Sequence, residues 1–287
     1  MYLHLFKIAT FAIMSNSQFI SHNNLKLEYL TYGSGSIPLL AFHGFGRHAE
    51  DYQVFEQLFG DKYTIYSFNL FHHGNSKYPS ERVEANTFTK TEFKEIFNQF
   101  FNQFSNTKFG VMGYSLGGKI ALMFTEIFPE KIESLWLFAP DGVKLNFWYI
   151  VASKTALGRG VYKYFLENPS IFFSMVNGLH RTKLINDKLK KFAINNMDEK
   201  EKRELVYTVW LTFKNTNPKM NVCISNILAH KIPVNQFFGK NDKVIKPQLG
   251  DRFSKKINQP ENYHVLQAGH NLLTTRTCKY IESLRIL

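Results

Sequence analysis

The chain has 287 residues, long enough for one large domain or for a core domain with an insertion. Apolar residues make up 44% and charged residues 20%, which excludes an intrinsically disordered chain. Its 35 lysines and arginines exceed its 23 aspartates and glutamates and give a net charge of +12. Because these cations are dispersed and surround no recognisable nucleic-acid-binding module, we interpret the charge as a solubilising surface and expect no nucleic-acid partner.

Cysteine content and the N-terminal segment bear on location. Cys223 and Cys278 are too few for a disulfide framework, they fit a reducing compartment, and we expect a cytoplasmic protein. The apolar residues 1–14 fall short of the roughly 20 residues that cross a bilayer, and they lack the basic start and the cleavage site of a signal peptide. We therefore expect no membrane span, and we interpret 1–14 as an extension in which Met14 is the true initiator.

Strand-like and helical segments alternate along most of the chain, a pattern typical of a parallel sheet wrapped by helices. The first two strands flank a turn at 23–24 and are expected to form an antiparallel hairpin. The expected strands are 18–22, 25–32, 37–42, 63–68, 109–113, 132–139, 232–238 and 262–267. The expected helices are 50–59, 89–104, a helix ending at 128, 247–256, and a last helix from about 271.

The alternation stops between residues 141 and 227, where helical, aromatic-rich and basic sequence takes over. This span carries a net charge of +7, more than half of the chain's +12. A helical insertion in an α/β core is the simplest interpretation. The sequence therefore predicts a core made of 15–140 and 228–287 and a helical cap at 141–227.

The pentapeptide Gly113-Tyr114-Ser115-Leu116-Gly117 matches the pattern G-x-S-x-G. It follows an apolar strand and opens an apolar helix, which is the context of a nucleophile elbow, a sharp strand-to-helix turn that presents a serine hydroxyl. A tight turn with a helix-capping serine would give the same five residues. The pentapeptide alone leaves both interpretations open.

Two further segments favour the nucleophile. A serine hydroxyl needs a base to take its proton, and an imidazole base needs a carboxylate to orient it. Asp242 directly follows one predicted strand and His270 follows the last one, so both are expected at the sheet edge that presents Ser115. Asp141, after the preceding strand, is a rival for the carboxylate, but the Gly-x-x-Asp loop ending at Asp242 matches better.

Together with His43-Gly44-Phe45-Gly46, these segments resemble the α/β-hydrolase fold superfamily over essentially all of residues 17–287. The resemblance implies a mostly parallel eight-stranded α/β sheet flanked by helices, with an inserted helical cap. It also implies that Ser115 is the nucleophile, His270 the general base and then acid, and Asp242 the orienting carboxylate. The backbone N–H groups of Phe45 and Leu116 would form the oxyanion hole.

The sequence departs from the family after its fourth predicted strand, where D-x-x-G-x-G-x-S is usual. Asn69, His72 and His73 occupy that window, and we interpret the loop as structural. His264, in a strand pattern, and His43, in the oxyanion loop, are likewise expected to be structural. No set of metal ligands is visible, so we expect no metal and no cofactor.

The leading hypothesis for function is a serine hydrolase that cleaves a carboxylic ester or a related acyl bond. The aromatic residues of the insertion either pack the cap onto the core or line an apolar acyl pocket. Candidate substrate-binding residues are His43, Tyr114, Trp148 and Arg159. The alternatives are a carbon–carbon bond hydrolase or menaquinone-pathway-like synthase with an anionic substrate, and a non-catalytic receptor for a small ligand. The sequence leaves the oligomeric state open.

Overall fold

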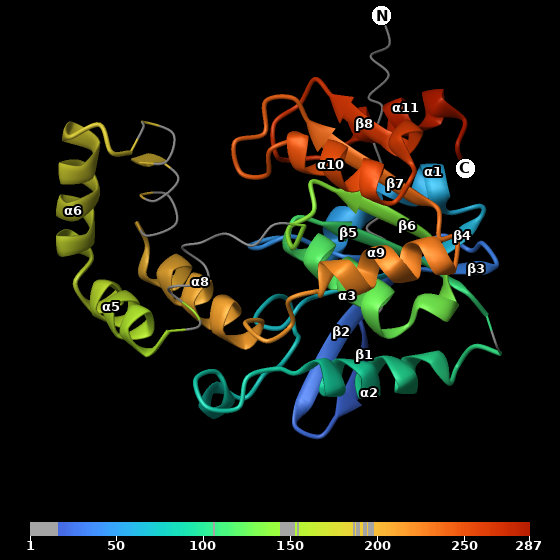
Figure 1. Ribbon diagram of the computed structural model, residues 1–287. Helices are drawn as coiled ribbons and strands as arrows, with labels where there is room; N and C mark the ends of the chain where they lie inside the picture. The colour runs from blue at the N-terminus through green and yellow to red at the C-terminus, as the bar shows by residue number, and fades with distance from the viewer. Residues whose placement is uncertain are drawn as a thin grey trace, which may run out of the picture.

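An eight-stranded sheet forms the centre of the computed structural model, which describes residues 17–105, 107–143, 153, 155–185, 187, 190–191, 194 and 198–287 (Figure 1). The strands lie side by side in the order β1-β2-β4-β3-β5-β6-β7-β8. They are β1 (Gln18–His22), β2 (Leu25–Tyr32), β3 (Ile37–Phe42), β4 (Tyr63–Phe68), β5 (Phe109–Tyr114), β6 (Ile132–Phe138), β7 (Val234–Gly239) and β8 (Tyr263–Leu266).

The direction of the strands agrees with the sequence pattern. β1 and β2 form an antiparallel hairpin, β2 is antiparallel to β4, and every other neighbouring pair is parallel. Asn23, in the turn of the hairpin, has a φ of 51°, a left-handed conformation that asparagine tolerates well. The predicted mostly parallel, eight-stranded α/β fold is confirmed.

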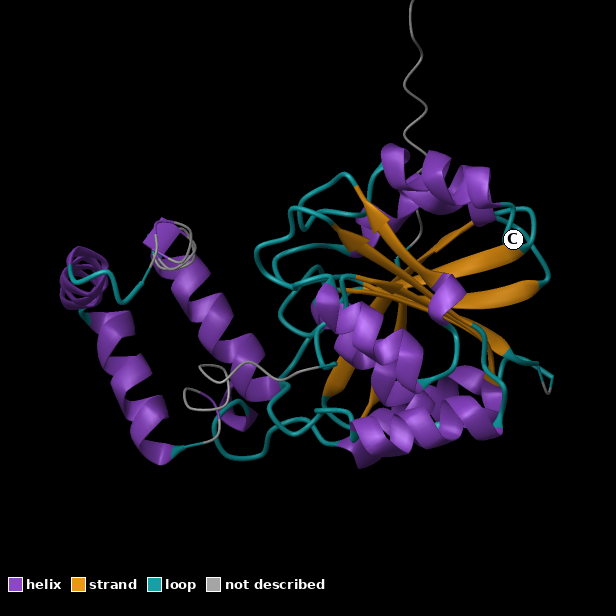
Figure 2. Cartoon of the chain, turned by 45° about the horizontal axis from the view of Figure 1, so that its top comes forward, coloured by secondary structure: helices purple, strands orange, loops and turns teal. Residues whose placement is uncertain are grey.

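Helices cover both faces of this sheet (Figure 2). α2, α3 and α9 pack on one face, and η1, α1 and α11 pack on the other. The α-helices are α1 (Glu56–Phe59), α2 (Lys90–Phe101), α3 (Leu116–Ile127), α5 (Ala156–Glu167), α6 (Pro169–Arg181), α8 (Lys200–Thr212), α9 (Met220–Ala229), α10 (Gln248–Lys256) and α11 (Thr275–Leu284). Short 3-10 helices are η1 (Ala49–Phe55), η2 (Ser80–Arg82), η3 (Pro129–Lys131) and η4 (Pro260–Asn262).

The abundance of phenylalanine is explained by the core beneath α2. Phe93, Phe97 and Phe124 form a buried triangle with ring-centroid separations of 4.6 to 4.8 Å. α2 begins with a capping box, in which the hydroxyl of Thr89 accepts the N–H of Glu92 and the Glu92 carboxylate accepts the N–H of Thr89. The cap fixes the start of a helix whose apolar stripe then faces the sheet.

Two predicted helices differ from the structure. The segment predicted as a helix at 50–59 is mostly the 3-10 helix η1. The last helix begins at Thr275 rather than near 271, because the hydroxyl of Thr274 accepts the N–H of Thr277 and caps it there. Leu272 and Leu273, ahead of that cap, are buried in the core as an irregular segment.

The helices α5, α6 and α8 lie to one side of the sheet in both views (Figures 1 and 2). The nearby helix α9, which contains the predicted boundary at residue 227, packs on α3 in the core. The boundaries of the cap stay a prediction, and residues 144–150 lie outside the described part of the chain. Among the residues that the structure describes, no helix is both long and apolar enough to cross a bilayer.

Candidate active site

Ser115 occupies the sharp turn between β5 and α3, with φ of 51° and ψ of −115°. Such a conformation is unfavourable for a residue with a side chain and is kept only where the surroundings enforce it. Two glycines allow the turn. A Cβ atom on Gly117 would lie 1.8 Å from the carbonyl oxygen of Phe42, and one on Gly113 would lie 2.4 Å from that of Gly117. α3 therefore approaches β3 closely, and Ser115 stands at the carboxyl edge of the sheet.

Three side chains from three loops meet at this edge. Nε2 of His270 lies 3.0 Å from Oγ of Ser115, and Nδ1 of His270 lies 2.7 Å from Oδ2 of Asp242. The loops after β7 and β8 approach each other because residue 239 is glycine. A Cβ atom on Gly239 would lie 2.0 Å from the carbonyl oxygen of Gly269. An imidazole in this arrangement can take a proton from a serine hydroxyl while a carboxylate stabilises the resulting charge.

The Asp242 carboxylate is fully buried and held from both sides. Its Oδ1 accepts the backbone N–H groups of Val244 and Ile245, at 2.7 and 2.9 Å, while Oδ2 faces His270. Asp141, the rival carboxylate, uses its Oδ1 to accept the N–H of the neighbouring Gly142. The geometry therefore favours Asp242 over Asp141 as the partner of His270.

The loop after β3, residues 43–46, lies beside Ser115. A Cβ atom on Gly44 would lie 3.2 Å from the Cβ of Ser115, so the backbone approaches the serine closely. Among the described residues, the N–H of Phe45 donates no hydrogen bond. Leu116 is the first residue of α3, where an N–H group has no acceptor within its own helix. Both N–H groups are thus available to an oxygen atom of a bound ligand.

His43 is inaccessible to a ligand, although it was a candidate substrate-binding residue. Its ring is fully buried, Nδ1 donates to the carbonyl of Gly44 at 2.7 Å, and Nε2 accepts the N–H of Leu70 at 3.0 Å. Burial, with the neighbouring His73 as a second cause, lowers the pKa of His43 well below its usual value. His43 therefore acts through the loop that it supports, because both of its ring nitrogens are already used.

The other three candidate substrate-binding residues are Tyr114, Arg159 and Trp148. The Tyr114 ring lies 5.3 Å from that of His270 and borders the site, and burial raises the pKa of Tyr114 to about 12. Arg159 lies on α5 and donates to the carbonyl of Ser153 at 3.4 Å. Among the described atoms, it makes no hydrogen bond to Ser115, Asp242 or His270. Trp148 lies outside the described residues.

The loop after β4, residues 69–76, is a structural support. Nε2 of His72 lies 2.8 Å from the Thr212 hydroxyl on α8, and Nε2 of His73 accepts the N–H of Gly46 at 3.1 Å. Burial lowers the pKa of both histidines to about 4. His264 on β8 stacks on Phe237 of the neighbouring strand β7, and burial lowers the pKa of His264 as well.

Glu28 on β2 escaped the sequence analysis. It is buried, and its carboxylate accepts hydrogen bonds from the hydroxyl of Ser17, the side chain of Asn69, and both the backbone and the side chain of Asn75. Desolvation raises its pKa, but these hydrogen bonds outweigh it and leave the pKa lowered. The available signal was Asn69, which stands where the family usually has aspartate and thus leaves the loop without its own carboxylate.

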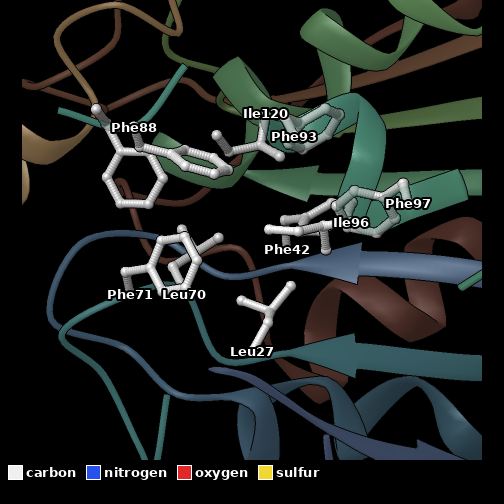
Figure 3. A pocket seen from close by; sticks show the side chains of 10 residues that line it. Leu27, Phe42, Leu70, Phe71, Phe88, Phe93, Ile96, Phe97 and Ile120 are labelled. Carbon is white, nitrogen blue, oxygen red and sulfur yellow. The ribbon is translucent and has the colours of Figure 1, made fainter. Parts of the chain in front are cut away.

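A small apolar cavity lies between the sheet and α2, and Ser115 is not one of its lining residues (Figure 3). It has a volume of about 20 Å³ and is lined by residues that include Phe42, Phe93 and Ile120. Such a volume holds one water at most, and an apolar lining keeps it dry, so it is a packing defect rather than a substrate site. Within the described ranges, no three His, Cys, Asp or Glu side chains are grouped as metal ligands.

Comparison with known proteins extends these findings. The family model described as alpha/beta hydrolase fold matches residues 37–277. The chain is 23% identical to Lipase 3 of Moraxella sp. (strain TA144), over 87% of this chain and 80% of that protein. It is 25% identical to Lipase 1 of Psychrobacter immobilis, over 86% and 79% respectively. A thermophilic esterase from Thermogutta terrifontis has a similar fold, with a TM-score of 0.65 and 17% identity, over 94% of this chain and 98% of that one.

The family match spans most of the chain, including the loops that carry Ser115, Asp242 and His270. The relatives and the similar structures support a hydrolase of the α/β fold. On the residues, the sheet order and the family match taken together, the chain belongs to the alpha/beta hydrolase fold family.

Proposed function

We propose that the protein is a serine hydrolase that cleaves carboxylic esters or related acyl bonds through an acyl-Ser115 intermediate. The observation that carries the proposal is the pair of short contacts from His270, to Ser115 at 3.0 Å and to Asp242 at 2.7 Å. The left-handed turn at Ser115 supports it, because a capping serine has no need of a strained backbone. The names of the two lipase relatives favour an ester substrate.

In the acylation step, Oγ of Ser115 attacks the ester carbonyl while Nε2 of His270 takes the hydroxyl proton. Asp242 stabilises the imidazolium that forms. The carbonyl oxygen becomes an oxyanion, which the N–H groups of Phe45 and Leu116 stabilise. When the tetrahedral intermediate collapses, the bond to the alcohol oxygen breaks, and His270 returns the proton to the leaving alcohol.

In the deacylation step, water takes the place of the alcohol. His270 removes one proton from the water, whose oxygen attacks the acyl carbon and forms a second tetrahedral intermediate. The bond to Oγ of Ser115 then breaks, and the proton on His270 returns to the serine. A carboxylic acid leaves, and the three side chains regain their starting protonation.

The insertion at 141–227 is proposed as a cap over this site. Its described aromatic residues pack on each other: ring centroids are 5.5 Å apart for Phe165 and Phe172, and 5.4 Å apart for Tyr162 and Tyr207. These contacts join α5 to α6 and α5 to α8 within the insertion. An acyl pocket formed by the rest of the insertion stays a prediction.

The alternatives have less support. An anionic substrate needs a cation at the site, and the candidate Arg159 is hydrogen-bonded to Ser153 on the insertion. A non-catalytic receptor has no need of the aligned Ser115, His270 and Asp242 side chains. Hydrolysis assays with neutral esters and with anionic dienones distinguish the proposed ester hydrolase from the enzymatic alternative with an anionic substrate.

The direct test is labelling with a fluorophosphonate, a probe that phosphonylates activated serines, read by intact mass and peptide mapping. We expect one adduct on Ser115 in the wild type, and none in Ser115→Ala or His270→Ala. Hydrolysis of p-nitrophenyl esters is expected to fall by about 10⁴-fold or more in both variants. Full ester hydrolysis by Ser115→Ala would refute the assignment of the nucleophile.

A further inference from the structure

The loop 69–76 contributes none of Ser115, His270 and Asp242, yet three hydrogen bonds join it to the oxyanion loop (residues 43–46) and to Ala49 beyond it. Nε2 of His43 accepts the N–H of Leu70, Nε2 of His73 accepts the N–H of Gly46, and Oδ1 of Asn69 accepts the N–H of Ala49. The distances are 3.0, 3.1 and 2.8 Å. Of the three bonds, only the one between His73 and the N–H of Gly46 involves a peptide that flanks Phe45.

The N–H of Phe45 belongs to the peptide unit that carries the carbonyl of Gly44. Because a trans peptide is planar, a bond to the carbonyl also fixes the direction of the N–H, which points the opposite way. The Gly44 carbonyl accepts Nδ1–H of His43 at 2.7 Å and the N–H of Arg47 at 3.2 Å. The peptide before the Phe45 Cα atom is therefore fixed by His43.

The peptide after the Phe45 Cα atom is fixed by His73, through the N–H of Gly46. The His73 ring also packs edge-on against the ring of Phe45, with centroids 6.1 Å apart and an interplanar angle of 88°, and against His43 at 4.8 Å. Gly46 has a φ of 66°, in the region that glycine adopts without a steric cost, so the residue restrains this part of the backbone little by itself. His73 thus contacts both the backbone and the side chain on the far side of Phe45.

The tautomer of His73 is set by its second contact. Nδ1 lies 3.1 Å from the carbonyl oxygen of Phe71, so the ring proton lies on Nδ1 and donates to that oxygen. Nε2 then carries the lone pair that accepts the N–H of Gly46. The ring is only 3% exposed, and burial lowers its pKa to about 4, so the accepting form prevails at neutral pH.

We propose that His73 is a positioning residue that fixes the Phe45–Gly46 peptide, on the far side of Phe45 from the peptide held by His43, and thereby keeps the Phe45 backbone and its N–H in place for the developing oxyanion. The role rests on the proposed ester hydrolysis, in which that N–H stabilises charge on the substrate oxygen. Its effect is expected in the transition state rather than in substrate binding, because the oxyanion forms only there.

The chain offers two kinds of control. Gln and Asn both carry an amide oxygen, but in Gln this oxygen is as many bonds from Cα as Nε2 is in histidine, whereas in Asn it is one bond closer. His73→Gln can therefore accept the N–H of Gly46, and His73→Asn is too short to do so. The second control is His72, a partly buried residue of the same loop, whose Nε2 contacts Thr212 on α8 instead of the oxyanion loop.

Steady-state hydrolysis of a p-nitrophenyl ester by these variants is the first measurement. We expect His73→Asn to lower kcat by about 10- to 100-fold with KM nearly unchanged, because the donor is misaimed rather than removed. His73→Gln is expected to recover most of kcat, and His72→Asn to stay close to the wild type. A boronic acid that mimics the tetrahedral intermediate should lose affinity in parallel with kcat.

The second measurement is amide hydrogen exchange over residues 43–47 in the folded variants, which needs no catalysis. We expect faster exchange in His73→Asn than in His73→Gln or His72→Asn. Equal kcat and equal exchange in the two His73 variants, or an equal loss in His72→Asn, would overturn the inference. A wild type that hydrolyses no ester would count against the proposed function instead, and the exchange comparison would still decide whether His73 fixes the loop.

Discussion

Oε2 of Glu28 and Nδ2 of Asn69 form a buried hydrogen bond of 2.8 Å, although 41 residues separate them in the chain. Oδ1 of the same amide accepts the N–H of Ala49, the first residue of η1. One carboxylate on β2 therefore orients the amide that anchors the end of the oxyanion loop. The position of that loop depends on a residue from a strand that contributes nothing to the chemistry.

Replacement of Glu28 by Gln is expected to destabilise the fold. The carboxylate accepts N–H and O–H groups, and an amide NH₂ in its place would face these donors without an acceptor. We expect a loss of about 2–4 kcal/mol in the free energy of unfolding, measured by urea denaturation. Glu50→Gln, at an exposed site of η1, is the matched control and is expected to change little. Equal stability of the two variants would contradict this account of Glu28.

Replacement of Asp242 and of Asp141 is expected to affect kcat very differently. Asp242→Asn is expected to lower kcat by about 10⁴-fold, because an amide at that position no longer stabilises the imidazolium of His270. Asp141→Asn keeps an oxygen that can accept the N–H of Gly142, so near wild-type kcat is expected. Steady-state hydrolysis of one p-nitrophenyl ester by both variants measures the difference. A large loss in Asp141→Asn with a small one in Asp242→Asn would reverse the assignment.

Glycine substitutions should have opposite effects in two helices. In Gly117→Ala the new methyl group meets the carbonyl oxygen of Phe42, a backbone atom, so we expect a loss of about 1–3 kcal/mol or an insoluble protein. In Gly160→Ala, within α5, the methyl group meets nothing within 4 Å, and the gain in helix propensity is expected to add up to about 1 kcal/mol. Thermal unfolding followed by circular dichroism tests both signs. Stabilisation by Gly117→Ala would show that α3 does not approach β3 as described.

Because two histidines have lowered pKa values in the folded protein, we expect the free energy of unfolding to fall in mild acid. His72 and His73 have pKa values of about 4 in the folded protein, against about 6.5 in an unfolded chain. The unfolded state therefore binds protons first as the pH falls. Their contribution to stability is complete above pH 6.5 and is lost between 6.5 and 4, by about 1.4 kcal/mol per pH unit for each histidine. Urea unfolding between pH 7.5 and 5 measures the slope, and His72→Gln is expected to reduce it. An unchanged slope in that variant would contradict a neutral His72 in the folded protein.

Sequence patterns were sufficient to predict which segments form strands, to predict the helices at 90–101 and 116–127, and to identify the family. Hydrophobic periodicity reports which residues face a core, and the core of this protein is built from such local stripes. The expectation that Ser115, Asp242 and His270 lie at one edge of the sheet also came from the sequence, because parallel strands end at one edge, but Asp141 met the same criterion. The exact start of the last helix did not follow, since it is fixed by a single hydrogen bond from the N–H of Thr277 to the hydroxyl of Thr274.

The sequence by itself determined the fold class and the set of residues available for chemistry. Only the tertiary structure decided that Asp242 rather than Asp141 faces His270, that His43 is fully enclosed, and that His72 and His73 point to different elements. The physical reason is that a pattern along the chain fixes which residues turn inward. The partner that each buried polar group finds depends instead on segments far apart in sequence, such as β2 and the loop after β4, which meet only when the sheet has formed.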